Sequence, residues 1–149
     1  MFRKILVAID GSKTANLALK EAITLAKEFR GSHVLGVYVV DSYSVTPEVE
    51  FITVEQVVVS MREEGKEILK VAQKKMDTAG IKFDTKLLET TASYQRISEV
   101  IAKEAQKWSA DLIVVGTHGR RGFSHLLLGS VAESIVRVAT KPVLLIRGK

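Results

Sequence analysis

The sequence predicts an α/β fold, with an open parallel sheet of five strands and helices on both faces. Short apolar runs alternate with longer segments of helical periodicity, which gives the order β-α-β-α-β-α-β-α-β. The apolar runs are nearly continuous, as in strands that are covered on both faces. Strict alternation is typical of parallel sheets built from right-handed crossovers. No shift in composition marks a boundary, so we expect residues 1–149 to form one domain.

The first half of the chain contains two of the predicted strands. The first lies within Arg3–Ile9, where apolar residues follow one another. From Ala15 to Phe29, apolar residues recur at helical spacing, and Gly31 ends this helix. His33–Val40 is predicted as the second strand. Asp41–Ile52 is polar and irregular, and we expect it to form a loop.

A long helix is predicted from Val54 to Ala79. Thr53 and Gln56 fit a capping box at its start, and Gly80 closes it. The remaining elements alternate strand, helix, strand, helix, strand, in the ranges Ile81–Glu89, Ile97–Trp108, Asp111–Val115, Val131–Val138 and Val143–Arg147.

Composition narrows the function classes. The chain has no cysteine, which excludes disulfides, zinc-thiolate sites and cysteine nucleophiles. Its net charge is +5, but the positive charges are spread along helices without a dense block or an aromatic array, so we expect no nucleic-acid partner. The apolar run before Asp10 is too short for a signal peptide, and no stretch is long enough to span a bilayer. We therefore expect a cytoplasmic protein without a membrane partner.

The segment from Gly116 to Ser130 carries the clearest functional signal. Gly116 and Gly119 follow a buried strand, at the edge where open α/β sheets bind ligands. Gly129 and Ser130 lie where the last helix begins, and a helix N-terminus offers unpaired N–H donors. These two elements predict an anion cradle for phosphates. The segment is neither a Walker A loop nor a GxGxxG fingerprint.

The glycine motif also carries a family resemblance. Gly116, Gly119, Gly129 and Ser130 follow the pattern Gly, two residues, Gly, nine residues, Gly, Ser. Together with the strand sequences at 4–12, 111–116 and 141–146, this pattern resembles the ATP-binding branch of the universal stress protein family along the whole chain. The resemblance implies a Rossmann-like sheet of order 3-2-1-4-5. It also implies bound ATP, with Mg²⁺ or Mn²⁺ held mainly by the phosphates.

The resemblance assigns roles to individual residues. Asp10 would contact the ribose or adenine, and the backbone of Val39 would meet the adenine. The residues that would line the ribose and phosphates are Val115, Gly116, Gly119, Gly129, Ser130 and Val131. The resemblance further implies a homodimer in which Val143–Ile146 pairs with its twin, and a regulatory protein of unknown identity that responds to the ATP-bound state.

Several of these residues have a structural alternative. Asp10 can instead cap the first helix or its preceding turn, and Gly116 and Gly119 can be ordinary turn glycines. Ser130-Val131-Ala132-Glu133 is itself a capping-box pattern, in which the Ser130 hydroxyl would bond the backbone of Glu133. Asp41 can assist a metal or a ribose, or can cap the loop that it starts.

The loop also contains polar side chains, but no recognisable catalytic set. Arg120 and Arg121 can pair with phosphate or remain solvated, and His118 and His125 have no acidic partner at a recognisable spacing. We expect no catalytic residues and no metal site built by the protein. The expected function is an ATP-binding regulatory protein of the stress response. The alternatives are a slow ATPase or adenylating enzyme, and a dimerisation module without nucleotide.

Overall fold

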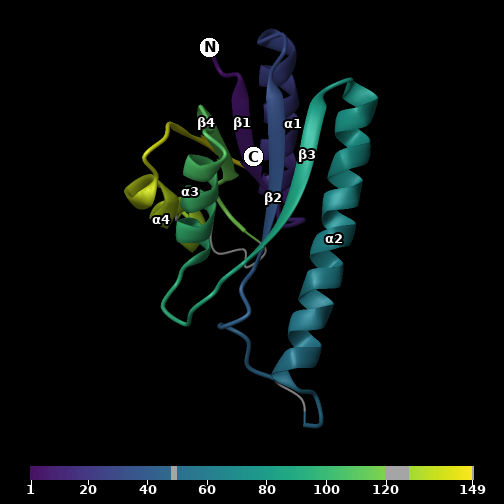
Figure 1. Cartoon of the computed structure of the whole chain (residues 1–149), viewed down its shortest axis with the longest axis vertical. Coiled ribbons are helices and arrows are strands. Elements are labelled where there is room, and N and C mark those ends of the chain that lie inside the picture. The colour runs from purple at the N-terminus through teal and green to yellow at the C-terminus, as the bar shows by residue number, and fades with distance from the viewer. Residues whose placement is uncertain (48–49, 120–127, 149) are drawn as a thin grey trace.

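The five strands form one parallel sheet in the order β3-β2-β1-β4-β5, as a computed structural model of the chain shows (Figure 1). The structure describes residues 1–47, 50–119 and 128–148. The strands are β1 (Lys4–Ala8), β2 (His33–Val40), β3 (Lys82–Glu89), β4 (Leu112–Gly116) and β5 (Val143–Ile146). The helices are α1 (Lys13–Glu28), α2 (Val54–Ala79), α3 (Ile97–Lys107) and α4 (Ser130–Val138). The predicted fold class and strand order are confirmed.

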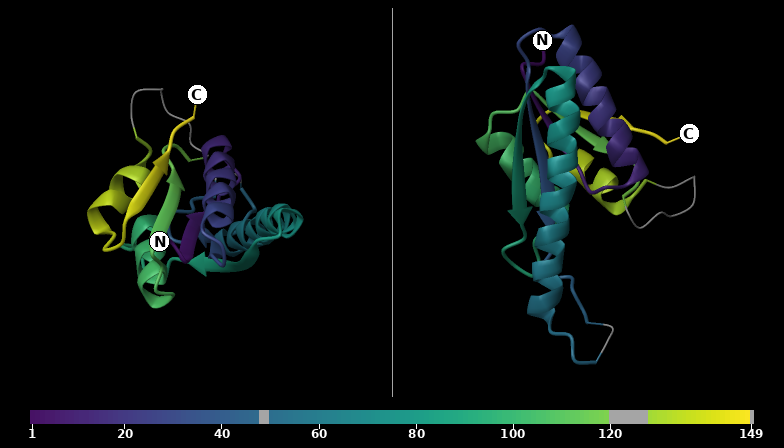
Figure 2. Two further views of the ribbon diagram at one scale, coloured as in Figure 1. Left: turned by 90° about the horizontal axis from the view of Figure 1, so that it is seen from above. Right: turned by 90° about the vertical axis from the view of Figure 1, so that its right-hand side faces the viewer.

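Each face of the sheet packs against two helices (Figure 2). Because side chains alternate along a strand, Ile5 and Val7 of β1 lie in the core under α1 and α2. Leu6 lies in the core under α3 and α4. The alternation is repeated in β2 and β4, which explains why the central strands read as continuous apolar runs.

The helix ends follow the signals in the sequence. The predicted capping box of α2 is present, with Thr53 and Gln56 each bonded to the other's backbone. Gly80 ends the same helix in the left-handed conformation, at φ 71°. The limits differ by a residue or two elsewhere: α1 begins at Lys13, and β5 ends at Ile146.

A glycine inside α2 lets this helix approach the sheet closely. Gly65 is buried, and a Cβ at this position would lie 2.6 Å from Tyr38 of β2 and 2.7 Å from Leu87 of β3. Both distances are shorter than a carbon–carbon contact allows. Gly65 therefore fixes the distance between α2 and the β2–β3 half of the sheet.

Candidate functional site

The candidate site lies at the carboxyl ends of β1 and β4, where the order of the strands reverses. The chain leaves β1 toward α1 and leaves β4 toward α4, and these helices cover opposite faces of the sheet. A crevice opens at such a switch point in α/β sheets, outside the strand ends. Asp10 follows β1 and Gly116 ends β4, so the topology brings the two predicted walls together.

Asp10 is held by its own turn and faces the glycine segment. Its Oδ1 accepts a hydrogen bond from the Ser12 N–H at 2.8 Å, so the predicted turn role is present. The cap of α1 is Ser12, whose hydroxyl accepts from the Ala15 N–H at 3.2 Å. A Cβ at Gly119 would lie 3.1 Å from Asp10 Oδ2. The second carboxylate oxygen is therefore directed at Gly119.

Gly119 and Gly129 approach each other although nine residues lie between them in the chain. The Gly129 N–H donates to the Thr117 carbonyl at 2.6 Å, and a Cβ at Gly129 would lie 3.5 Å from the Gly119 nitrogen. The two glycine-containing ends of the 116–130 segment therefore lie against each other, and neither glycine places a side chain between them. Arg120, Arg121 and His125 lie outside the described residues.

The N-terminus of α4 has no side-chain cap. Gly129 occupies the N-cap position and Ser130 is the first helical residue, so the capping box predicted for Ser130 and Glu133 is wrong. The Glu133 carboxylate instead accepts from Arg137 at 3.1 Å. The first N–H groups of a helix have no intrahelical acceptor. With glycine at the cap, no side chain of that residue competes for these donors.

Gly116 has a packing role that the sequence did not reveal. A Cβ there would lie 2.5 Å from the Thr14 hydroxyl oxygen and 2.7 Å from its backbone carbonyl carbon. The glycine therefore lets the first turn of α1 rest directly on the end of β4. Thr14 also donates a short hydrogen bond to the His118 carbonyl, which ties this turn to the start of the glycine segment.

The backbone of Val39 lies just past the last hydrogen bond between β1 and β2. The ladder between β1 and β2 ends with a bond from the Ile9 N–H to the Val37 carbonyl, at 2.9 Å. Residues two apart on a strand turn their backbone groups to the same side, so Val39 presents its own N–H and carbonyl beyond this last bond. A flat ligand in the crevice can meet them there.

Val115 and Val131 lie beneath the site. Val115 is 2% exposed and belongs to the core under α3 and α4. Val131 is half-buried against the same cluster. Their side chains support the cradle from below, and only their backbone groups, or one face of Val131, can border a ligand.

A cluster of hydrogen-bonded polar side chains lies at the carboxyl ends of β2 and β3. Asp41 accepts from the Thr90 hydroxyl at 3.2 Å, so its side chain contacts the end of β3. The Arg62 guanidinium of α2 donates to both carboxylate oxygens of Glu89, at 2.8 and 2.9 Å. These bonds hold the pKa of Glu89 below its ordinary value, against the opposing effect of burial. The cluster anchors α2 and the 41–47 segment beside the crevice.

We expect Glu89→Gln to destabilise the protein near neutral pH but not in acid. Because the folded pKa is lowered, the contribution of Glu89 is complete above the unfolded pKa, about 4.3, and disappears as the pH falls through the folded value. Urea unfolding across this range should show the two proteins converging in acid. A constant difference at every pH would contradict the ionic explanation.

The structure offers no metal site of its own in the described ranges, where no group of three or more His, Asp or Glu residues is placed to hold an ion. Two surface hollows are formed by the described residues, one between α1 and α2 and one at the start of α2. None of the predicted site residues lines either of them.

Comparison with known proteins gives a consistent match. The model of the universal stress protein family matches residues 1–147. Universal stress protein MJ0531 of Methanocaldococcus jannaschii is 38% identical, over 99% of this chain and 83% of its own length. The solved structure of MJ0577, from the same organism, has a TM-score of 0.86 and 30% identity, over 100% of this chain and 98% of the other. A family structure from Arabidopsis thaliana, solved with AMP bound, has a TM-score of 0.70 and 19% identity, over 98% and 92% of the two chains.

Proposed function

The chain belongs to the universal stress protein family, and we propose that within it this protein is an ATP-binding regulator of the stress response. The proposed site is the crevice between β1 and β4. The observation that carries the proposal is the close approach of Gly119 and Gly129 beside the N-terminus of α4, which has no side-chain cap. Backbone N–H groups without neighbouring side chains, at the positive end of a helix, suit a phosphate chain.

The proposed contacts follow from where each group lies. The backbone of Val39 would bond the adenine, and Asp10 Oδ2 would accept from a ribose hydroxyl. The N–H groups of Gly119, Ser130 and Val131 would bind the phosphates, with the Ser130 hydroxyl available as a further donor. A divalent cation would be held by the phosphates and water, since the described residues provide no cluster of ligands for it.

ATP would act by stabilising one state of the protein rather than by efficient chemistry. A ligand that binds only the folded state stabilises it by about 2.7 kcal/mol at a hundred times its dissociation constant. We propose that this energy stabilises the ligand-bound state of the protein, and that a partner protein recognises that state. No helix within the described ranges is long and apolar enough to cross a membrane. We propose that the protein acts as one domain in the cytoplasm.

The nucleotide that copurifies with the protein tests this function. Mass spectrometry of the released ligand should identify ATP, and the bound ATP should persist for hours. A relative with bound AMP makes AMP the main competing ligand. Sustained, metal-dependent release of ADP or AMP would favour the ATPase or adenylating enzyme instead. Absence of any nucleotide, with no thermal shift on adding Mg-ATP, would favour the dimerisation module.

We also propose that the protein forms a homodimer through β5. This strand is at the edge of the sheet and is half-exposed along its length. The carbonyls of Pro142 and Ile146 accept hydrogen bonds from the β4 side, so the even-numbered residues of β5 direct their backbone groups toward β4. Val143 and Leu145 therefore direct their backbone groups outward, where a second copy can pair with them.

Leu145→Pro is expected to convert this dimer to a monomer without unfolding it. Proline removes an N–H that points away from β4, so the ladder between β4 and β5 stays intact. Light scattering at micromolar concentration measures the mass, and circular dichroism checks the fold. If the unmodified protein is a monomer under these conditions, the proposed dimer is wrong.

A further inference from the structure

The start of α2 extends past the sheet and exposes apolar side chains. In Figure 1 the first turns of this helix lie below the ends of the strands, away from the rest of the molecule. Phe51 is 97% exposed, and Ile52 and Val54 are each 44% exposed. We call Glu50–Glu55 the tip. The helix is continuous to Ala79, so it holds the tip away from the core of its own chain.

An apolar seam runs from the tip along α2. Its positions alternate between spacings of three and four residues, the pattern of a helix that packs against another helix. The seam consists of Val54, Val57, Met61, Glu64, Ile68, Val71 and Lys75, of which all but Glu64 and Lys75 are apolar. Met61 and Ile68 also pack in part against the core of their own chain. Val71 is 54% exposed and Val57 is only half-buried, so the seam is incompletely covered.

Charge is divided between the two halves of this helix. Carboxylates outnumber cations from Glu50 to Glu67, where Arg62 and Lys66 are the only basic residues. Cations outnumber carboxylates from Ile68 to Lys82, where Asp77 is the only acidic residue. An antiparallel neighbour of identical sequence places each half beside its opposite charge.

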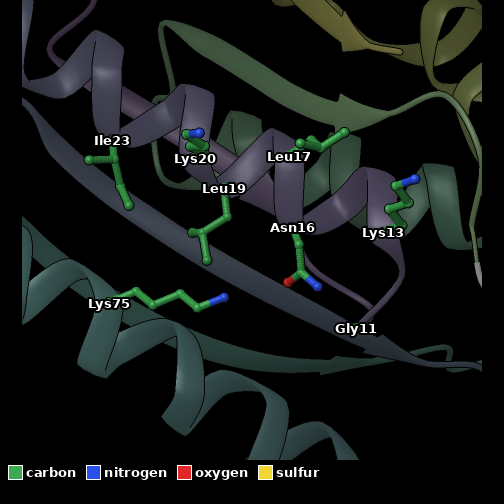
Figure 3. Close-up of a pocket in the computed structure, with 8 residues that line it drawn as sticks. All are labelled: Gly11, Lys13, Asn16, Leu17, Leu19, Lys20, Ile23 and Lys75. Atoms are coloured by element: carbon green, nitrogen blue, oxygen red, sulfur yellow. The ribbon is translucent and has the colours of Figure 1, made fainter. Parts of the chain in front are cut away.

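A groove beside the basic half can receive the tip. It lies between α1 and α2 and has a volume of about 700 Å³. Besides Gly11 and Asn16, it is lined by apolar and basic side chains: Leu17, Leu19, Ile23, Lys13, Lys20 and Lys75. Figure 3 shows Lys75 extending from α2 toward α1, beneath Leu19. The tip has the complementary composition, with Phe51 and Ile52 between Glu50 and Glu55.

We propose that two copies of this chain pair through antiparallel α2 helices, with the tip of each copy in the α1–α2 groove of the other. The pairing is self-complementary, as a two-fold axis requires. With Glu64 at the axis, Val57 of one copy lies opposite Val71 of the other, and Met61 lies opposite Glu67, next to Ile68. This interface uses no residue of β5, so it is separate from the dimer proposed above.

A disulfide at the axis tests this arrangement directly. The chain has no cysteine, so a single introduced thiol reports only its own position. Under a mild oxidant, Glu64→Cys should form a disulfide-linked dimer rapidly, because the two copies of position 64 face each other. Glu63→Cys, on the outer side of the same turn, should remain monomeric on a non-reducing gel. The result should persist in the Leu145→Pro background. Absence of the Glu64→Cys dimer, or equal crosslinking by both variants, would overturn the pairing and leave the tip to another partner.

An apolar side chain at the axis should strengthen the pair. Leucine at position 64 would add an apolar contact where the seam otherwise has a polar side chain. We expect Glu64→Leu to lower the dissociation constant of the α2 pair by about tenfold, measured by sedimentation in the Leu145→Pro background. Glu63→Leu adds the same apolar side chain outside the seam and should leave the constant unchanged. Equal tightening by both variants would indicate nonspecific association and contradict the proposal.

Discussion

Gly119→Val is expected to lower the affinity for ATP by at least about a hundredfold, which corresponds to about 2.7 kcal/mol. A Cβ at this position already lies 3.1 Å from Asp10 Oδ2, and the branched side chain of valine would enter the space proposed for the ligand. The substitution also screens the backbone N–H groups that would bind phosphate. Gly119 is exposed, so the fold without ligand should be nearly unchanged.

A loss of ATP affinity in Gly119→Val shows a role in binding only if the stability of the protein without nucleotide is unchanged. Isothermal titration with Mg-ATP measures the affinity, and urea unfolding without nucleotide measures the fold. Gly119→Ala serves as the matched control, because the flexible Asp10 side chain can move by a few tenths of an ångström; its loss of affinity should be much smaller. Unaltered ATP binding by Gly119→Val would exclude Gly119 from the site.

Gly116→Ala, in contrast, is expected to lower the stability of the protein even without nucleotide. The added Cβ would lie 2.7 Å from the backbone carbonyl carbon of Thr14, so the start of α1 must shift to accommodate it. Overpacking of this kind typically costs about 1–3 kcal/mol. The free energy of unfolding in urea, without ligand, measures this cost.

Gly119→Ala, which adds the same methyl group, is the control for Gly116→Ala. There the neighbouring atom is the end of a side chain rather than backbone, so Gly119→Ala should unfold close to the unmodified protein. If Gly116→Ala is equally stable, the contact between α1 and β4 does not require a glycine.

The fold was predictable because its signals are local. Apolar runs indicate buried strands, and the capping box at Thr53 and the glycine at position 80 mark the ends of α2 within a few residues. The alternation of strands and helices does not by itself determine which strands are neighbours. The order 3-2-1-4-5 came from the resemblance to a family, and the structure confirms it.

The candidate site was less predictable, because its contacts join distant parts of the chain. The capping box at Ser130 was wrong since Gly129 takes the cap position, and a local pattern cannot distinguish two starts that differ by one residue. The contact between Gly116 and Thr14 joins segments about a hundred residues apart, so spacing alone gave no signal for it. The Ser12 cap of α1 was missed, although a serine just before a helical pattern is a local signal for an N-cap.

The central claim is that the crevice between β1 and β4 binds ATP, and calorimetric titration of nucleotide-free protein with Mg-ATP tests it most directly. The account predicts saturable binding of one ATP per chain that is lost in Gly119→Val and retained in Glu64→Leu, whose substitution lies on α2. No measurable binding to the unmodified, folded protein at millimolar Mg-ATP would contradict it.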